Sequence, residues 1–243
     1  MLDDDNGAAP RGRPGRRAVI AHRGASRAEA ENTLAAFRRA EAMGADAVEL
    51  DVRRTADGVL VVHHNPHLDD GRLVAATVHA DLPDHLPTLG EALDACQGMW
   101  VNVEIKNDPD EPDFDPTESI ADETIAHLVA RDDDARWLIS SFRMETVDRC
   151  RALAPTIRTA WLCVDVPDGV ERTLVRKGHA ALHPWHHAVD RALLDRCHAA
   201  GVEVNVWTCD DAERMAALYE WGIDGICTNV PDLAVTVRAA APA

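Results

Sequence analysis

Residues 18–53 read AVIAHRGASRAEAENTLAAFRRAEAMGADAVELDVR, and this stretch decides the fold. It begins with an apolar β-rich run at 18–22 and ends with a second such run at 47–53. Between them, residues 33–43 place Leu34, Phe37 and Ala40 on one side at a period near 3.6, which predicts an amphipathic helix. Asn32 or Thr33 is a plausible cap for this helix. A strand, a helix and a second strand in this order predict two parallel strands joined by a crossover.

The same unit continues along the chain. Further strands are predicted at 100–106, 137–140, 157–161, 180–183, 202–208 and 222–227, with an extra extended segment at 59–63. Amphipathic helical runs are predicted between the strands, among them 89–96, 118–131, 144–153, 191–200, 211–221 and 231–240, with Asp210 and Asn229 as caps of the last two. Eight strand–helix units in series predict an α/β fold, a TIM-type (β/α)8 barrel. An open doubly wound sheet is the alternative, and the lack of a Gly-rich phosphate loop after the first strand weakens it.

Length and composition agree with a single barrel domain. The chain has 243 residues, the usual size of one such barrel, and 46% of them are hydrophobic. Residues 1–17 are acidic and then Gly/Pro/Arg-rich, which predicts a disordered leader rather than a secretory signal, so the barrel domain is expected at 18–243. No apolar run approaches the roughly 20 residues that cross a bilayer. The six cysteines show no metal-binding spacing and are expected to be reduced and buried, in a cytoplasmic protein.

The charge of the chain restricts its partners. The formal net charge of −17 argues against nucleic acid, because a phosphate backbone needs a basic footprint. It also argues against stable association with anionic membranes. An acidic protein that binds an anion needs a locally positive electrostatic potential, which a bound cation or fixed Arg or Lys groups can supply. Lysine occurs only as Lys106 and Lys177, so Lys106, two residues after Glu104, is an unusual choice for a surface position.

Three carboxylates are expected on the inner face of the barrel. Glu49 and Asp51 leave the same face of one strand, and Glu104 and Lys106 repeat the arrangement on the next. Buried carboxylates need a cation or hydrogen bonds, and three such oxygens suit Mg²⁺ or Ca²⁺ better than zinc. The alternative is a buried ion-pair network, in which Glu104 pairs with Lys106 and Glu49 pairs with Arg23. The cation is the favoured interpretation because these charges gather at strand ends.

Two histidines are expected beside the carboxylates. His22 ends the first strand and His64 ends the extended segment, and together they form an acid–base pair near neutral pH. His63 competes with His64, but adjacent residues of an extended segment face opposite ways, so only one of them serves. Arg23 suits phosphate oxygens by its fork and Lys106 by its point charge.

Other side chains receive less specific interpretations. Trp207 has two compatible interpretations: it fills the top of the barrel, and it forms a wall against which a polyol or head group lies. The histidine-rich run at 183–187 is expected to be a surface loop, at most one that gates the substrate. Residues 107–116, rich in Asp, Glu and Pro, are expected to form a mobile loop at the active end.

Taken in order, these residues resemble the glycerophosphodiester phosphodiesterase family. The matching stretches are 22–24 (HRG), 31–37 (ENTLAAF), 44–52 (GADAVELDV), 55–58 (TADG), 61–64 (VVHH), 103–106 (VEIK), 140–142 (SSF), 206–208 (VWT) and 222–229 (GIDGICTN). They cover nearly the whole chain after the leader. Two departures are Ala30, where a proline commonly precedes Glu-Asn-Thr, and Asn65, where an aspartate usually follows the second histidine. Without that aspartate, one anion that would raise the pKa of His64 is missing.

The resemblance implies a TIM-type barrel that hydrolyses glycerophosphodiesters, small-molecule substrates, to an alcohol and sn-glycerol 3-phosphate. It implies Glu49, Asp51 and Glu104 as ligands of one divalent cation, His22 and His64 as general acid and base, and Arg23 and Lys106 as phosphate contacts. Two rivals are a lipid phosphodiester substrate and a catalytically silent barrel that binds its ligand as a sensor. The head group, the choice between Mg²⁺ and Ca²⁺ and the oligomeric state do not follow from the sequence.

Overall fold

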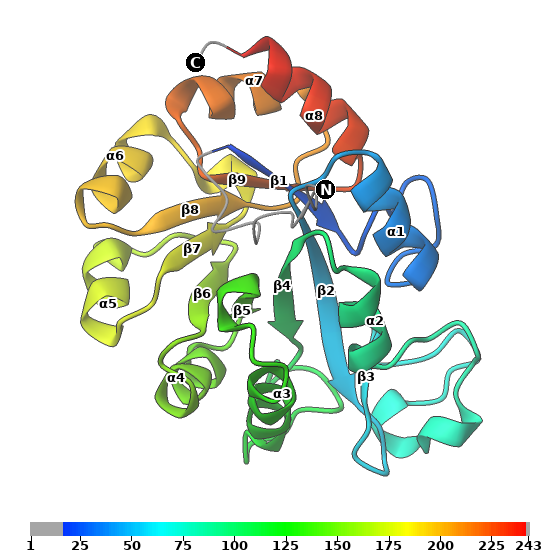
Figure 1. The fold of residues 1–243 in the computed structure, drawn as a ribbon. Coiled ribbons are helices and arrows are strands. Elements are labelled where there is room, and N and C mark those ends of the chain that lie inside the picture. Colours follow the sequence, from blue (N-terminus) through cyan, green and yellow to red (C-terminus); the bar gives the residue numbers. More distant parts are fainter. Residues whose placement is uncertain (1–16, 242–243) are drawn as a thin grey trace, which may run out of the picture.

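Eight parallel strands form a closed ring in the computed structural model, which describes residues 17–241 of the chain. They are β1 (Ala18–His22), β2 (Ala47–Arg54), β4 (Trp100–Ile105), β5 (Trp137–Ser141), β6 (Arg158–Cys163), β7 (Ala181–Pro184), β8 (Glu203–Val206) and β9 (Gly225–Thr228). Strand β1 pairs with both β2 and β9, and this closes the ring (Figure 1). The ring confirms the predicted barrel and excludes the open sheet, which would leave two free edges.

A helix follows each parallel strand and covers the outside of the ring (Figure 1). The helices are α1 (Leu34–Ala42), α2 (Leu89–Ala95), α3 (Ser119–Val129), α4 (Met144–Leu153), α5 (Val170–Lys177), α6 (Arg191–Ala199), α7 (Ala212–Trp221) and α8 (Pro231–Ala240). Helix α5 is not among the predicted ones; it is short and lies between Gly169 and Gly178, which both have left-handed backbones. None of the helices in residues 17–241 has the length and apolar character that crossing a bilayer requires.

One strand lies outside the ring, and it confirms the extra extended segment predicted at 59–63. Strand β3 (Leu60–Val62) pairs antiparallel with β2. The chain then makes a long excursion with two short 3₁₀ helices, Val74–Ala76 and His79–Asp81, before α2. A small apolar cluster lies beneath the excursion, formed by Val61, Leu68, Val74, Leu82 and Leu86. This cluster fixes the direction in which the chain leaves β3.

Alternation along the strands divides the core into two regions. On β2, Val48, Leu50 and Val52 belong to the large cluster that includes residues of the outer helices, whereas Ala47 belongs to a separate cluster. The second cluster consists of strand residues and fills the lower barrel interior: Ala18, Ile20, Ala47, Trp100, Leu138, Ala160, Ala181 and Cys227. Glu49 and Asp51 share the face of Ala47 and therefore point into the barrel above this apolar plug.

The helix caps agree with the prediction for one helix and differ for two. Thr33 caps α1, and its Oγ1 accepts a hydrogen bond from the Ala36 amide. Helix α7 is capped by Asp211 rather than Asp210, because Asp211 is the residue whose carboxylate reaches the Arg214 amide. Helix α8 begins after Val230 with no side-chain cap, and Asn229 has other partners. The predicted leader at 1–17 lies outside the described residues apart from Arg17.

Candidate active site

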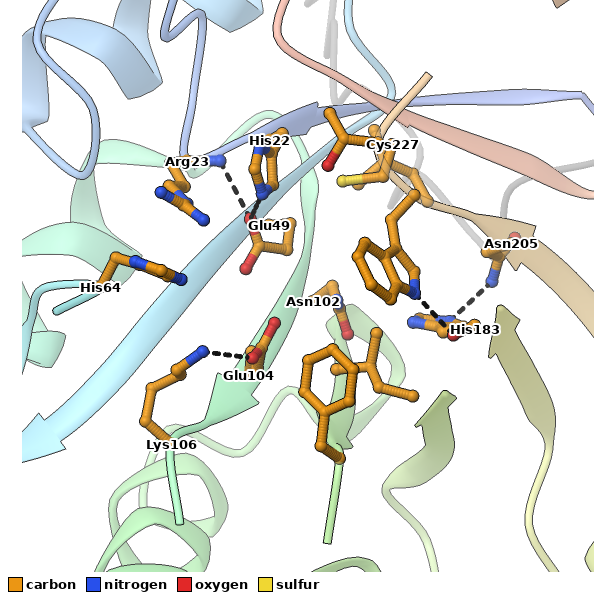
Figure 2. Close-up of a pocket in the computed structure, with 15 residues that line it drawn as sticks. His22, Arg23, Glu49, His64, Asn102, Glu104, Lys106, His183, Asn205 and Cys227 are labelled. Carbon is orange, nitrogen blue, oxygen red and sulfur yellow. Dashed lines mark hydrogen bonds and ion pairs between the residues drawn. The ribbon is translucent and has the colours of Figure 1, made fainter. Parts of the chain in front are cut away.

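A pocket opens at the end of the barrel where β1, β2 and β4 finish, and it gathers most of the residues singled out in the sequence (Figure 2). Its lining includes seven of them: His22, Arg23, Glu49, His64, Glu104, Lys106 and Trp207. Asp51 lies behind this lining and is 1% exposed. Carboxyl ends of parallel barrel strands meet at one face, which brings together groups more than 180 residues apart in sequence.

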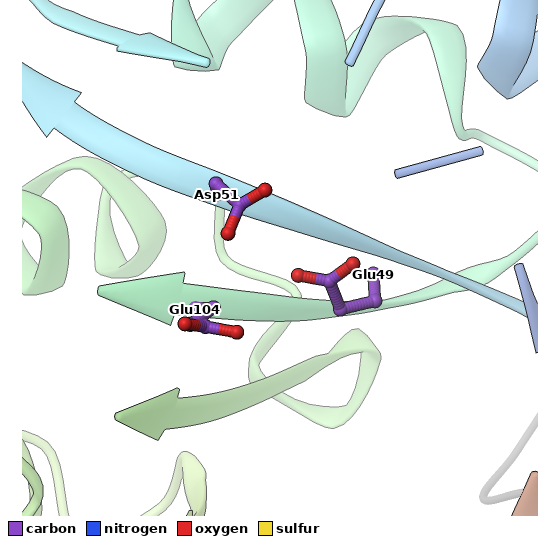
Figure 3. A group of neighbouring side chains, drawn as sticks. All are labelled: Glu49, Asp51 and Glu104. Carbon is purple, nitrogen blue, oxygen red and sulfur yellow. The ribbon is translucent and has the colours of Figure 1, made fainter. Parts of the chain in front are cut away.

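The three carboxylates form one buried group. Glu49, Asp51 and Glu104 each offer an oxygen, and these oxygens all lie within 4.8 Å of one another (Figure 3). The parallel register between β2 and β4 causes this, because it places Asp51 opposite Glu104 and Glu49 one layer below. Carboxylate oxygens in such a group are the usual ligands of Mg²⁺ and Ca²⁺.

The positive groups balance this cluster only in part. Lys106 Nζ lies 2.9 Å from Glu104 Oε1 and 3.8 Å from Asp51 Oδ1. Arg23 Nη1 pairs with Glu31 at 2.9 Å, and Arg23 Nε lies 3.3 Å from Asp51 Oδ2. The ion-pair network expected as the alternative is therefore present for Glu104, whereas Arg23 reaches Glu49 through its backbone amide alone, at 3.0 Å. Glu49 Oε1 is buried and has no hydrogen-bond partner among residues 17–241.

The proton affinities of the carboxylates reflect this uneven pairing. Burial, together with the neighbouring charges of Asp51 and Glu104, raises the pKa of Glu49 well above its ordinary value. Burial also raises the pKa of Glu104, despite Lys106 beside it. Burial would raise the pKa of Asp51 too, but Lys106 and Arg23 hold it below its ordinary value. A cation bound among these oxygens would relieve the repulsion that burdens Glu49, so the residues fit such a group.

His22 is held from behind by an amide and a carboxylate. Its Nδ1 lies 2.7 Å from Asn229 Oδ1, and Asn229 Nδ2 donates to Asp210 Oδ2 at 2.7 Å. Because the amide nitrogen faces the carboxylate, the amide oxygen must accept from His22, which places the imidazole proton on Nδ1. Nε2 is left unprotonated and lies 4.0 Å from Glu49 Oε2. Burial, with Arg23 nearby, lowers the pKa of His22.

His64 faces the pocket and His63 does not. His64 Nδ1 lies 3.0 Å from Asn65 Oδ1, whereas His63 Nε2 lies 3.2 Å from the carbonyl of His67 on the outside. Burial lowers the pKa of His64 to about 4, although Asp51 opposes this effect. Asn65, at the position of the missing aspartate, contacts the ring as a neutral amide.

The turn after β1 gives Arg23 its place. Arg23 and Gly24 both have positive φ, at 55° and 82°. A Cβ on Gly24 would lie 2.6 Å from the backbone carbon of Ala36, so only glycine lets the turn pack against α1. This close contact holds the Arg23 amide against Glu49.

Arg53 supports the site and was not predicted. It is 0% exposed, and its Nε and Nη2 donate to the carbonyl of His64 at 2.9 and 2.6 Å. The same guanidinium pairs with Asp113 at 2.6 Å and with Glu111 at 2.9 Å, both in the 107–116 loop. It follows Glu49 and Asp51 on the same strand face, and that spacing was the available signal.

The opposite wall of the pocket is aromatic. Phe142 and Trp207 meet edge to face with ring centroids 5.3 Å apart, and Trp207 Nε1 donates to the carbonyl of His183 at 2.7 Å. Trp207 therefore lies in the wall of the pocket, and its contact with a substrate stays a prediction. Cys227 also lines the pocket, and all six cysteines are free and buried.

His183 corrects the prediction of a surface loop at 183–187. It is the third residue of β7, 3% exposed, and it lines the pocket beside Asn205 (Figure 2). His183 shares the inward face of Ala181, which is in the barrel interior, so alternation turns it into the pocket. The run leaves the strand after Pro184: Trp185 is exposed, as predicted for a surface loop, and His186 in the short 3₁₀ helix His186–Ala188 is buried.

Comparison with known proteins gives a consistent result. A model of the glycerophosphoryl diester phosphodiesterase family matches residues 22–80 and 71–233. A glycerophosphodiester phosphodiesterase of Caldanaerobacter subterraneus subsp. tengcongensis is 30% identical over 90% of this chain and 96% of its own length. A glycerophosphodiester phosphodiesterase of Bacillus altitudinis is also 30% identical, over 90% of this chain and 97% of its own length. A phosphodiesterase of Oleispira antarctica, solved in complex with the product sn-glycerol-3-phosphate, superposes with a TM-score of 0.80 at 28% identity, covering 91% of this chain and 96% of the other.

Proposed function

The chain belongs to the glycerophosphoryl diester phosphodiesterase family and is a phosphoric diester hydrolase, and on that premise we propose how its own residues act. We propose that it hydrolyses glycerophosphodiesters to an alcohol and sn-glycerol 3-phosphate, with one divalent cation and two histidines. The relatives' names and the product bound in the Oleispira antarctica enzyme support the reaction. The proposed roles of the cation and of the two histidines are supported by the geometry of the pocket.

One observation carries the proposal. Glu49, Asp51 and Glu104 offer oxygens within 4.8 Å of one another, and a buried oxygen of Glu49 has no partner in the described chain. An unpaired buried carboxylate is costly, so the cluster suits an ion that binds all three residues. Mg²⁺ or Ca²⁺ held there would polarise a phosphoryl oxygen and the attacking hydroxyl and so stabilise developing negative charge. Arg23 and Lys106 remain beside the cluster to contact the other phosphate oxygens.

The histidines move the protons in two displacement steps. In the first, the glycerol 2-hydroxyl oxygen attacks phosphorus, His22 Nε2 takes its proton, and the phosphorus–alcohol bond breaks as His64 protonates the leaving oxygen. In the second, water attacks the cyclic phosphate, His64 takes a proton from the water, and His22 returns its proton to the 2-oxygen. Both rings then have their starting protonation and the product is sn-glycerol 3-phosphate.

The surroundings of each ring support these roles. His22 has its Nδ1 proton fixed by Asn229, so its free Nε2 is suited to accept a proton. Burial lowers the pKa of the His64 imidazole to about 4, so the ring is neutral before the substrate binds. An anionic phosphodiester beside the ring favours the imidazolium form and so prepares His64 to donate.

The test is release of glycerol 3-phosphate from glycerophosphocholine and from glycerophosphoethanolamine. We expect release with Mg²⁺ or Ca²⁺, loss of release after EDTA, and recovery when one cation is restored. Glu49→Gln should weaken cation binding, measured independently as a smaller cation-induced rise in Tm. Release that survives exhaustive chelation contradicts the cation; a folded protein that releases nothing under any condition contradicts the reaction and favours a silent binder.

A further inference from the structure

The floor of the pocket carries polar side chains that the two displacement steps do not use. Asn102 on β4, His183 on β7 and Asn205 on β8 line it, below the charged residues at the barrel mouth (Figure 2). Asn102 precedes Glu104 by two residues on the same strand face and lies opposite Glu49 in the register of β2 and β4. The floor therefore begins at the level of Glu49, one layer below Asp51 and Glu104.

Asn102 offers an unpaired acceptor to this floor. The residue is 3% exposed, and its Oδ1 is buried without a hydrogen-bond partner in residues 17–241. Buried polar atoms in native proteins are nearly always paired, because leaving one unpaired costs free energy. Since Asn102 lines the pocket, the missing partner is expected to be a molecule in the pocket.

His183 offers a donor to the same floor. Its Nε2 lies 3.0 Å from Asn205 Nδ2, so with the amide in this orientation Nε2 accepts and the ring proton lies on Nδ1. No described residue accepts that proton. Burial lowers the pKa of His183 to about 3, which keeps the ring neutral. The carbonyl of His183 also holds Trp207, so the ring is tied to the aromatic wall.

An acceptor and a donor together select one kind of ligand group. A hydroxyl both donates and accepts, whereas an ionised phosphate oxygen accepts only and a quaternary ammonium does neither. Ile20, Leu162 and Cys227 surround the floor and make it apolar elsewhere. In such a site an analogue that lacks the hydroxyl leaves both polar groups unpaired, and selection is strong.

We propose that Asn102 and His183 form a subsite for the glycerol 1-hydroxyl of the substrate, the hydroxyl left free when the 2-hydroxyl attacks phosphorus. The inference rests on the proposed hydrolysis of glycerophosphodiesters. The register supports it, since Asn102 is paired with Glu49 and the 1- and 2-hydroxyls are on adjacent carbons. The subsite makes the enzyme select the glycerol half of the diester, and it leaves the alcohol half to the barrel mouth.

The test compares sn-glycero-3-phosphocholine with its 1-deoxy analogue, which keeps the attacking 2-hydroxyl. For the wild-type protein we expect kcat/KM to fall by at least about 10²-fold on the analogue, toward the roughly 10⁴–10⁵-fold that sites built to hydrogen-bond a substrate hydroxyl reach. Asn102→Ala should reduce this ratio to about tenfold or less, mainly by losing activity on the natural diester. His183→Leu should also reduce this ratio, and it is the variant to measure if Asn102→Ala does not fold.

Ser140→Ala is the matched control. Ser140 is a buried residue of β5 whose hydroxyl also has no partner in the described chain, but it does not line the pocket. Its substitution should keep the wild-type ratio. A wild-type protein that hydrolyses both substrates equally, or variants that retain the full ratio, would overturn the subsite. Failure of the wild type to hydrolyse either substrate would instead contradict the proposed function.

Discussion

His22 and His64 differ in what holds their rings. His22 is fixed by Asn229 and, behind it, by Asp210, on the loops after β9 and β8. His64 is fixed by the amide of its neighbour Asn65 and, through its own backbone, by Arg53. The contacts of Asn229 define the proton position on His22, and each ring keeps its Nε2 free of hydrogen bonds to the described residues, as a group that exchanges protons with a substrate requires.

At this scale we predict that His22→Ala and His64→Ala each lower kcat by about 10²–10⁴-fold, the usual contribution of a proton-transfer group. His63→Ala is the matched control, because its ring contacts the His67 carbonyl outside the pocket. It should retain activity within a few-fold of wild type. Steady-state kinetics on glycerophosphocholine measures all three, and a His64→Ala protein as active as His63→Ala would remove His64 from the mechanism.

At the scale of elements, strand β2 connects the carboxylate cluster to the long loop after β4. Glu49, Asp51 and Arg53 follow one another on its inner face. Arg53 is fully buried and pairs with Asp113, whose side chain is 6% exposed, while it also binds the carbonyl of His64. The 107–116 loop, predicted to be mobile, is thus tied to the same guanidinium as a site histidine. Its mobility stays a prediction.

We predict that Arg53→Met destabilises the protein by about 3–5 kcal/mol, because it leaves Asp113 buried and unpaired. It should also lower kcat/KM, since His64 loses its backbone support. Arg54→Met is the control: Arg54 pairs with Glu123 on the surface, where such pairs contribute about 0–1 kcal/mol. Denaturant unfolding measures both variants. Equal, small effects of the two substitutions would show that Arg53 is not a structural link.

At the scale of the whole molecule, the barrel places neutral histidines inside an acidic protein. The net charge is −17, yet His183 lies in the interior with a pKa lowered by burial to about 3. An unfolded chain binds a proton on this ring below its ordinary pKa of about 6.5, and the folded chain does not. Acidification below that value therefore favours the unfolded state at this residue.

We predict that His183 contributes a loss of about 1.4 kcal/mol in the free energy of unfolding for each pH unit between roughly pH 6 and pH 4. His183→Leu should make the pH dependence shallower by that amount. Ser140→Ala, which removes no titrating group, should leave it as in wild type. Urea unfolding across this range without divalent cations measures the slopes, and parallel curves for wild type and His183→Leu would contradict the prediction.

Much of the fold was predictable because its signals are local. Apolar runs and helical periodicity identified the strands of the ring and most helices, and the order of units implied closure. Helix α5 was missed because it is short and mostly polar, and its buried face has only Val170 and Leu174 as apolar residues. Alternation within the strands likewise put Glu49 with Asp51, and Glu104 with Lys106, on inward faces. His63 and His64 were separated by the same rule and by family resemblance.

The partners of these residues were not predictable. Asp210 and Asn229 were expected to cap helices, and they hold His22 instead; His183 was expected on the surface, and it lies in the pocket floor. The sequence by itself determined the units of the barrel and the chemical groups at its strand ends, since both depend on neighbours within a few residues. Only the tertiary structure decided which groups meet, because strand register and ring closure bring together residues about 200 positions apart, such as His22 and Asn229.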